Sequence, residues 1–342
     1  MTNKAIRWVR KQLKKLFYEL FGRNNSGQYV QPVLHAAQGR AYVETVSSLA
    51  DSLHLQIKRL YEEDLQHGFL ALMSSLAPHF RKGNVRLAID RTEIGYYGKE
   101  QGFYIVGTSY NNKSYTKAFE YLTISVLTGS KEERIPLYAL PWHIGQDVVR
   151  SIEALLDTVK PWLGKIEVVQ FDRGFHNNEL IAWLESHKIP YLIHIQRHGK
   201  TIKDLVENTK SFNRTKYETT YNASKTTHPV KFNLYVCKNI QGKDWLFASS
   251  IWFKTKWQIR NLYQNRWQIE TNYAVTNQNR IMSKSTNVSI RYFYFLCDII
   301  LQVLWRIGGC CNLPFKTFLR TFVAGTKQIF EMKPTLKPCL PP

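Results

Sequence analysis

The chain has 342 residues, of which 44% are hydrophobic and 21% are charged, and these proportions exclude a disordered protein. Its 47 Lys and Arg residues outnumber its 26 Asp and Glu residues, which leaves a formal net charge of +21. Such an excess predicts a polyanionic partner, with nucleic acid as the first candidate and an anionic membrane surface as the second.

Cysteine usage and hydropathy exclude several other classes. The five cysteines include no CxxC pair, which argues against a disulfide framework or a zinc site and favours reduced thiols in a cytoplasmic protein. The N-terminus alternates charged and apolar residues, which is not typical of a signal peptide. Residues 292–305 are apolar, but they include Asp298 and fall short of the roughly 20 residues that span a bilayer. We therefore expect a buried helix there and no membrane span.

Residues 1–80 are predicted to form a helical domain. Residues 4–21 place apolar side chains along one stripe and Lys or Arg on the other face, and Gly22 is a natural helix stop. A basic amphipathic helix of this kind is suited to DNA or to a membrane surface. The alternative is an ordinary solvated face over a small core. Two further helices are expected around 40–54 and 56–76.

Residues 81–200 are predicted to be an α/β domain with a mixed sheet, because apolar runs typical of buried strands alternate with helical patterns. Strands are expected at 85–90, 103–111, 118–127, 133–140, 166–172 and 189–195, and helices at 147–163 and 177–188. Residues 201–252 lose the helical period and are predicted to be a β insertion. Helix returns in residues 253–310. The Pro-rich tail, 311–342, is expected to be poorly ordered at its end.

Two aspartates lie where a ligand site is expected. Asp90 and Asp172 each end an apolar strand, and the carboxyl ends of buried strands form the rim where α/β proteins bind ligands. The alternative is that each carboxylate only terminates its strand or caps the following turn. A third acid, Glu93, is expected in the loop after Asp90.

Glu270 is the single acid between Asp244 and Asp298, in a segment rich in Lys and Arg. On a helix, Tyr263, Arg266 and Glu270 share one face, because they are spaced by three and four residues. The alternative is an exposed Arg266–Glu270 ion pair, which would contribute only a few tenths of a kcal/mol.

Three carboxylates at one rim are suited to two Mg²⁺ or Mn²⁺ ions, since hard divalent cations prefer oxygen ligands. A pair of such ions activates a water or a 3′-hydroxyl and stabilises the leaving oxygen when a phosphodiester is displaced. The surrounding Lys and Arg would neutralise the phosphates of the substrate.

Three motifs in order resemble the DDE transposases of prokaryotic insertion sequences: "AIDRT" with Asp90, "VQFDRGF" with Asp172, and Tyr263-x2-Arg266-x3-Glu270. They are most similar to the cut-and-paste group that has a β insertion before the catalytic Glu and a Y-x2-R-x3-E-x6-K signature. The segment after Glu270 is similar to the branch common in archaea. The resemblance covers about 85–310 and implies an RNase H-like catalytic domain.

The resemblance implies roles for individual residues. Asp90, Asp172 and Glu270 would be the catalytic metal ligands. Arg266 would contact phosphates at the transposon end, and Tyr263 would help to hold a distorted or flipped nucleotide.

One position departs from the family pattern, because the signature Lys is Asn277 here. Arg280 and Lys284 would compensate as DNA-binding residues, or the copy is impaired, or its branch does not use the Lys. The family's β insertion carries an aromatic residue that stacks on a flipped base, and the candidates are Trp245, Trp252 and Trp257.

The resemblance also implies an activity and its partners. The protein is expected to bind the terminal inverted repeats of its element through residues 1–80, to cleave the ends, and to join the 3′-hydroxyls to target DNA. A homodimer in a synaptic complex on double-stranded DNA, and a cytoplasmic, nucleoid-associated location, follow. The alternatives are an RNase H-like nuclease without strand transfer, a decayed non-catalytic DNA-binding copy, and attachment to a membrane surface through residues 4–21.

Overall fold

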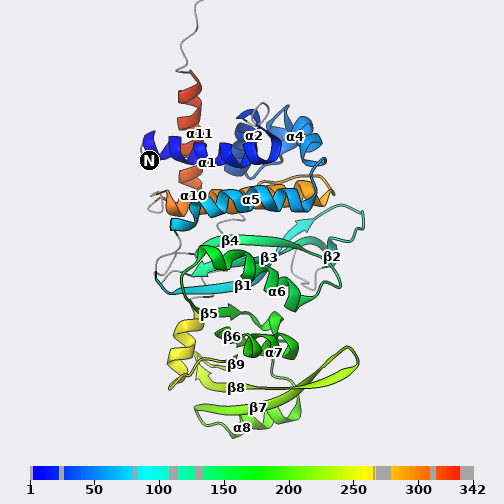
Figure 1. Ribbon diagram of the computed structural model, residues 1–342, viewed down its shortest axis with the longest axis vertical. Helices are drawn as coiled ribbons and strands as arrows, with labels where there is room; N and C mark the ends of the chain where they lie inside the picture. Colours follow the sequence, from blue (N-terminus) through cyan, green and yellow to red (C-terminus); the bar gives the residue numbers. More distant parts are fainter. Residues whose placement is uncertain are drawn as a thin grey trace, which may run out of the picture. The chain divides into compact units, whose positions relative to one another are not determined.

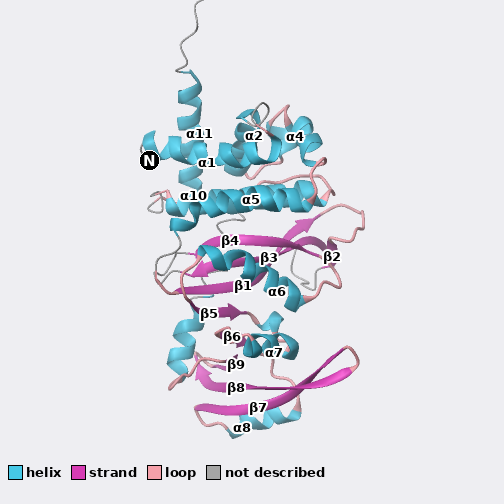
Figure 2. Ribbon diagram, in the orientation of Figure 1, coloured by secondary structure: helices cyan, strands magenta, loops and turns pink. Residues whose placement is uncertain are grey.

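The computed structural model describes residues 3–22, 27–79, 83–107, 115–127, 134–264, 266, 279–308 and 313–331. They belong to two compact units, each with its own core (Figures 1 and 2). The sheet unit is Ala77–Asn272, and the helical unit combines Met1–Leu76 with Tyr273–Pro342.

The sheet unit begins with an antiparallel meander followed by two parallel strands. The strand order is β4-β3-β1-β5-β6; β3 is antiparallel to both β1 and β4, whereas β5 and β6 run parallel to β1. This confirms the predicted RNase H-like mixed sheet. The strands are β1 (Val85–Tyr96), β2 (Ile105–Gly107), β3 (Lys117–Leu127), β4 (Arg134–Trp142), β5 (Ile166–Phe171) and β6 (Tyr191–His194).

Helices flank this sheet (Figure 1). The helix α6 (Val148–Val159) packs on β3 and β4. The helix α7 (Asn178–Ser186) packs on two strands at the other end of the sheet, β7 (Phe212–Ala223) and β8 (Thr226–Ile240). Each helix begins at the residue that the sequence favours as a cap. Asp147 accepts a hydrogen bond from the Arg150 amide, and Asn177 accepts one from the Glu179 amide.

The predicted β insertion extends the same sheet rather than forming a separate body. The strand β9 (Lys243–Ser249) pairs antiparallel with β6 and is followed outward by β8 (Thr226–Ile240) and β7 (Phe212–Ala223). One detail of the prediction was wrong, because the region opens with a helix, α8 (Lys200–Asn208). Ile202 and Val206 are four residues apart and both buried, which gives this short segment a helical apolar face.

The strand β1 is longer than the predicted 85–90. Its partner β3 pairs with it from Arg86 to Tyr96, whereas pairing with β5 ends at Ile89. Hydrogen bonds to β3 therefore carry the strand past the point where its apolar run stops. As a result Glu93, expected in a loop, lies within β1 opposite Glu120.

Residues 256–264 form a helix that packs onto the sheet through Ile259 and Tyr263, which join a core containing Val168 and Phe247. Most of the described residues between 256 and 306 are helical, as predicted, but residues 279–287 are not.

The helical unit is built around α10 (Val288–Ile307), which begins where the Asn287 side chain caps the Ile290 amide. Among the described residues, α10 has the length and composition of a membrane span, yet 89% of its most apolar 18-residue window is buried. It is a core helix, as predicted. The other helices are α1 (Asn3–Phe21), α2 (Val30–Gly39), α3 (Val43–Val46), α4 (Ala50–Ile57), α5 (Glu62–Leu76) and α11 (Phe315–Glu331).

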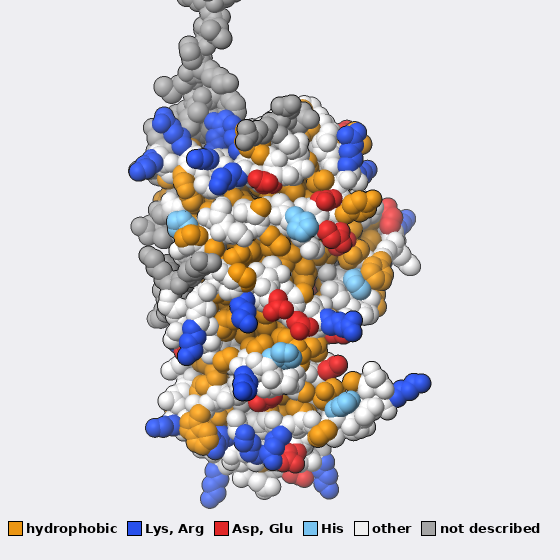
Figure 3. All heavy atoms as spheres, viewed as in Figure 1, with side chains coloured by type: hydrophobic (Ala, Val, Ile, Leu, Met, Phe, Trp, Pro, Cys, Tyr) orange, Lys and Arg blue, Asp and Glu red, His pale blue; other side chains and the backbone are white. Residues whose placement is uncertain are grey.

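Three expectations for this unit were inaccurate. The helix predicted at 40–54 is two short helices separated near Ser47, the helix α2 precedes them, and α11 lies where a tail was expected. The prediction for α1 is confirmed. It stops at Gly22, whose φ is +74°, and its apolar stripe is buried, with Phe17 edge-on against Phe293 at 5.7 Å. The opposite face exposes Lys and Arg, which gather on the surface over α1 (Figure 3).

Candidate functional site

The parallel pairing of β1 and β5 brings Asp90 and Asp172 together. The last pair of that ladder is Ile89 with Phe171, and the two aspartates are the next residue on each strand. Asp172 follows the end of β5, as expected. Asp90 does not end its strand, but it is the first residue of β1 beyond the parallel pairing, so it reaches the same edge as Asp172. The two carboxylates thus lie at one edge of the sheet although the sequence separates them widely.

A single guanidinium group bridges the two carboxylates. Arg266 Nη1 lies 3.7 Å from Asp90 Oδ2, and Arg266 Nη2 lies 3.8 Å from Asp172 Oδ2. The arginine side chain is only 7% exposed. Its Nε donates a hydrogen bond of 3.2 Å to the Tyr263 hydroxyl. The Arg266 charge therefore offsets the repulsion between the two aspartates.

Tyr263 is a buried support for this arrangement. Its ring packs against Phe247 and His194, with centroid distances of 4.9 and 5.8 Å. Only 3% of Tyr263 is exposed. In this structure the tyrosine holds Arg266 in place, while its expected contact with a nucleotide stays a prediction.

Burial dominates the electrostatics of the site. It raises the pKa of Asp90 from 3.8 to about 6, against the opposing effect of Arg266 and Arg134, and the charge of Asp172 adds to the increase. Burial also raises the pKa of Tyr263 to about 12. For Arg266, burial lowers the pKa, but Tyr263 and the two aspartates more than compensate, so the net change is upward.

The loop after β5 orients Asp172. Its carboxylate accepts a hydrogen bond from the Gly174 amide and so caps the turn Arg173–Phe175. A Cβ atom at Gly174 would lie 3.0 Å from Asp172 Oδ1. The glycine in "DRGF" is therefore explained by the close approach of this carboxylate to the backbone.

The donor set fits a hard divalent cation. Two carboxylates from neighbouring strands present oxygen atoms to one volume, and Asp172 remains 36% exposed. Among the described residues, no group of three His, Cys, Asp or Glu side chains is arranged to hold a metal ion. Glu270, the expected third ligand, and Asn277 lie outside the described residues.

Two buried polar residues near the site were missed by the sequence analysis. Arg134, 4% exposed, donates to the Thr123 hydroxyl at 3.4 Å, and Thr123 donates to the Asp90 carbonyl at 3.1 Å. Gln170 is fully buried two residues before Asp172, and within the described part of the chain neither atom of its amide has a hydrogen-bond partner. No local signal marks either residue, because Arg134 directly follows Glu132 and Glu133 in the sequence and Gln170 shares its strand with Glu167.

The remaining expected DNA-binding residues belong to the helical unit. Arg280 is partly buried, and its charge opposes the increase that burial imposes on the pKa of Asp298. Lys284 is exposed, with its ammonium 5.5 Å from the centroid of the Tyr42 ring.

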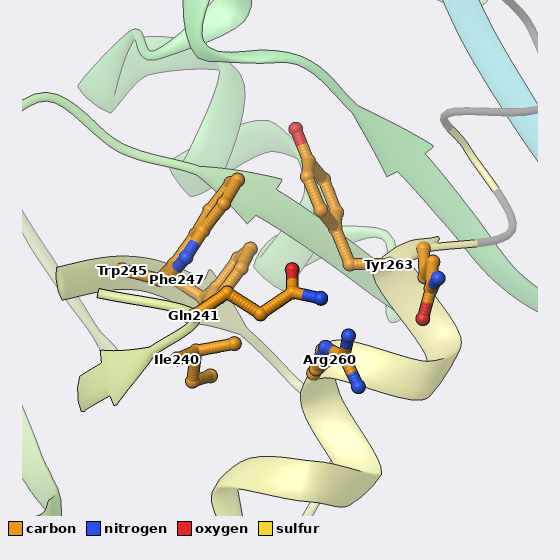
Figure 4. Close-up of a pocket in the computed structure, with 7 residues that line it drawn as sticks. Ile240, Gln241, Trp245, Phe247, Arg260 and Tyr263 are labelled. Carbon is orange, nitrogen blue, oxygen red and sulfur yellow. The ribbon is translucent and has the colours of Figure 1, made fainter. Parts of the chain in front are cut away.

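One of the three candidate tryptophans lines a pocket beside the site. Trp245 and Phe247 project from β9 toward the helix that carries Arg260 and Tyr263, and they line a small pocket that opens to solvent, with a cavity volume of about 20 Å³ (Figure 4). Gln241 lies at the same opening. The other two candidates, Trp252 and Trp257, are 63% and 48% exposed and lie outside this pocket.

Comparisons with known proteins relate the chain to transposases. Residues 144–290 match the family model described as "Transposase DDE domain", a span that contains Asp172, Arg266 and Glu270. A comparison with curated proteins returns no match for the sequence. Among solved structures, the chain is similar to piggyBac transposase in a synaptic complex with hairpin DNA. The TM-score is 0.58 at 13% identity, covering 98% of this chain and 82% of that one. The chain therefore carries a segment matching the transposase DDE domain, on a fold similar to that of piggyBac transposase.

Proposed function

We propose that the protein is a DDE transposase that cleaves the ends of its own element and joins the 3′-hydroxyls to target DNA. The observation that carries this proposal is the pairing of Asp90 and Asp172 at the edge of β1 and β5. The match to the transposase DDE domain supports the same assignment. Membership of the cut-and-paste group with the Y-x2-R-x3-E-x6-K signature, in the branch common in archaea, rests on the sequence motifs.

Asp90, Asp172 and Glu270 would hold two Mg²⁺ or Mn²⁺ ions, which would supply an activated water or 3′-hydroxyl and stabilise the leaving oxygen. The side chains would contribute positioning and charge. Asp172 is oriented by the Gly174 amide, and Arg266 is oriented by Tyr263 and supplies positive charge where the phosphates must approach.

The DNA would be bound by basic surfaces in both units. Residues 1–80, with the exposed Lys and Arg face of α1, would bind the terminal inverted repeats. Arg280 and Lys284 would contact phosphates. Trp245 and Phe247 would offer aromatic faces on which an unstacked base stacks, with Arg260 beside them. Two protomers would pair two ends as a homodimer, consistent with the synaptic complex of the similar piggyBac structure.

A strand-transfer assay tests the proposal. Purified protein is incubated with a labelled duplex carrying the element's terminal inverted repeat, Mg²⁺ and a plasmid target. We expect nicked or cleaved ends and a labelled joined product, and we expect Asp172→Asn to bind the duplex but yield neither. Cleavage without joining would support the nuclease alternative, and binding without cleavage would support a decayed copy. Cleavage by Asp172→Asn at the wild-type rate would show that the carboxylate site is assigned incorrectly.

A further inference from the structure

The position of Arg266 conflicts with a metal ion bound by the same aspartates. A divalent cation held by Asp90 and Asp172 requires their oxygens at roughly 2.0–2.6 Å. In the structure these oxygens face Arg266. Asp90 Oδ2 lies 3.7 Å from Arg266 Nη1, and Asp172 Oδ2 lies 3.8 Å from Arg266 Nη2. One guanidinium is therefore within ion-pair range of both carboxylates that would hold the ion.

We propose that Arg266 is an internal counter-ion that a divalent metal must displace, and that the displaced guanidinium then becomes available to a DNA phosphate. The inference rests on the proposed function, since it takes Asp90 and Asp172 to be metal ligands. It adds a regulatory coupling to that site: metal binding and phosphate binding reinforce each other through one side chain.

The surroundings of Arg266 favour such an exchange over a fixed structural ion pair. Its contacts to the two carboxylates are long, and one of them, Asp172, is 36% exposed, so a cation from solvent can reach the pair. The Nε contact to Tyr263 is independent of the aspartates. When the Nη atoms leave the carboxylates, Tyr263 can still retain the side chain at the same edge of the sheet.

The charges at the site also favour replacement of the Arg266 guanidinium by a divalent ion. Two carboxylates on neighbouring strands repel each other in a poorly solvated site, so the metal-free protein needs a cation there. A divalent ion replaces the single charge of Arg266 with two, and its repulsion of the buried guanidinium drives the Nη atoms away. By linkage, a phosphate that captures the released guanidinium must tighten metal binding by the same factor by which metal tightens phosphate binding.

Metal affinity of the DNA-free protein tests the proposal without relying on activity. Mn²⁺ binding is measured by electron paramagnetic resonance of the free ion for the wild type and for Arg266→Gln. Arg173→Gln is the matched control, because it removes an exposed positive charge next to Asp172 without touching the pair. We expect Arg266→Gln to bind Mn²⁺ about tenfold more tightly than the wild type, a difference of about 1.4 kcal/mol. We expect Arg173→Gln to change the affinity by less than about threefold, as an exposed charge is screened.

The outcomes separate the inference from the proposed function. Equal or weaker Mn²⁺ binding by Arg266→Gln, with binding abolished by Asp172→Asn, overturns the displacement and leaves the metal site intact. Equal tightening by Arg266→Gln and Arg173→Gln also overturns it, since the effect would then be long-range charge. Mn²⁺ binding that Asp172→Asn does not weaken overturns the metal site itself. Arg266→Lys keeps the charge but not the two-nitrogen bridge, so it serves if the glutamine variant does not fold, and we expect it to bind Mn²⁺ more tightly than the wild type.

The coupling has its own readout. Ca²⁺ is titrated against binding of a duplex with the element's terminal sequence, measured by fluorescence anisotropy at constant ionic strength. We expect Ca²⁺ to increase the affinity of the wild type more than that of Arg266→Gln. An equal increase in both proteins overturns the coupling.

Discussion

Replacing Asp90 by Asn is expected to stabilise the metal-free protein. The carboxyl group is only 14% exposed, and burial raises its pKa from 3.8 to about 6 despite the nearby arginines. The difference between these two values corresponds to about 3 kcal/mol of unfavourable free energy for the charged form at neutral pH. Asn keeps the size and the hydrogen-bonding capacity of the side chain but removes the charge. For a unit of this size, the change corresponds to an increase in Tm of roughly 6–12 °C.

The pH dependence gives the sign of the effect. Because the folded-state pKa is raised, the folded protein binds the proton more tightly than the unfolded chain does. The wild type therefore has its full share of stability from this group below about pH 3.8 and loses it as the pH rises through about 6. Asp90→Asn does not titrate at this position. The two proteins should be nearly equal in stability at pH 3.5, and the variant should gain its full advantage above pH 7.

The assay is urea unfolding followed by circular dichroism, in EDTA, at several pH values between 3.5 and 8. A surface substitution, Asp157→Asn in α6, controls for a general effect of removing a negative charge from a basic protein. The reasoning is refuted if Asp90→Asn is less stable than the wild type at pH 8. It is also refuted if the difference between the two proteins does not vary with pH.

Two further predictions concern the same site, and a third concerns DNA binding. Tyr263→Phe removes the acceptor of the Arg266 Nε hydrogen bond and should lower the free energy of unfolding in urea by about 1–3 kcal/mol. The control is Tyr97→Phe at an exposed position, which should change the free energy of unfolding by less than about 0.5 kcal/mol. Gly174→Ala places a Cβ atom 3.0 Å from Asp172 Oδ1, so the Asp172 carboxylate must move, and Mn²⁺ binding should weaken by about tenfold or more. An unchanged Mn²⁺ affinity would show that metal binding does not need the present orientation of Asp172. Asn277→Lys should strengthen binding to terminal DNA and steepen the dependence of log K on log salt by about one, measured by anisotropy between 50 and 200 mM salt. An unchanged salt slope for Asn277→Lys would show that position 277 does not meet a phosphate.

Local sequence patterns predicted most of the sheet unit. Apolar runs located β1, β3, β4, β5 and β6, since side-chain burial on a sheet requires such runs wherever they occur in the chain. The helices α6 and α7 were equally visible, because each has a capping residue followed by a helical apolar stripe. The predictions were wrong where pairing with a segment distant in the sequence determined the length of an element. The strand β1 runs on to Tyr96 because β3 supplies hydrogen bonds beyond the apolar run, and no local pattern carries that information.

The candidate site divides in the same way. Their positions at strand ends singled out Asp90 and Asp172, and the resemblance to DDE transposases added Arg266. They did not reveal that Arg266 lies between the two carboxylates, nor that Tyr263 is buried behind it. Arg134 and Gln170 were passed over, because a polar residue in a strand gains meaning only when its neighbours in space are known.

By itself, the sequence determined which residue types are available at the candidate site. It set the identity of the carboxylates, the helical spacing of Tyr263 and Arg266, and the excess of positive charge suited to DNA, since these depend on residue types and on short-range backbone geometry. Only the tertiary structure decided how that chemistry is assembled. The register between β1 and β5 places Asp90 beside Asp172, and packing of Tyr263 against Phe247 directs Arg266 between them. Register and packing are set by hydrogen bonds and contacts between segments far apart in the chain, and the site exists only when all of them form together.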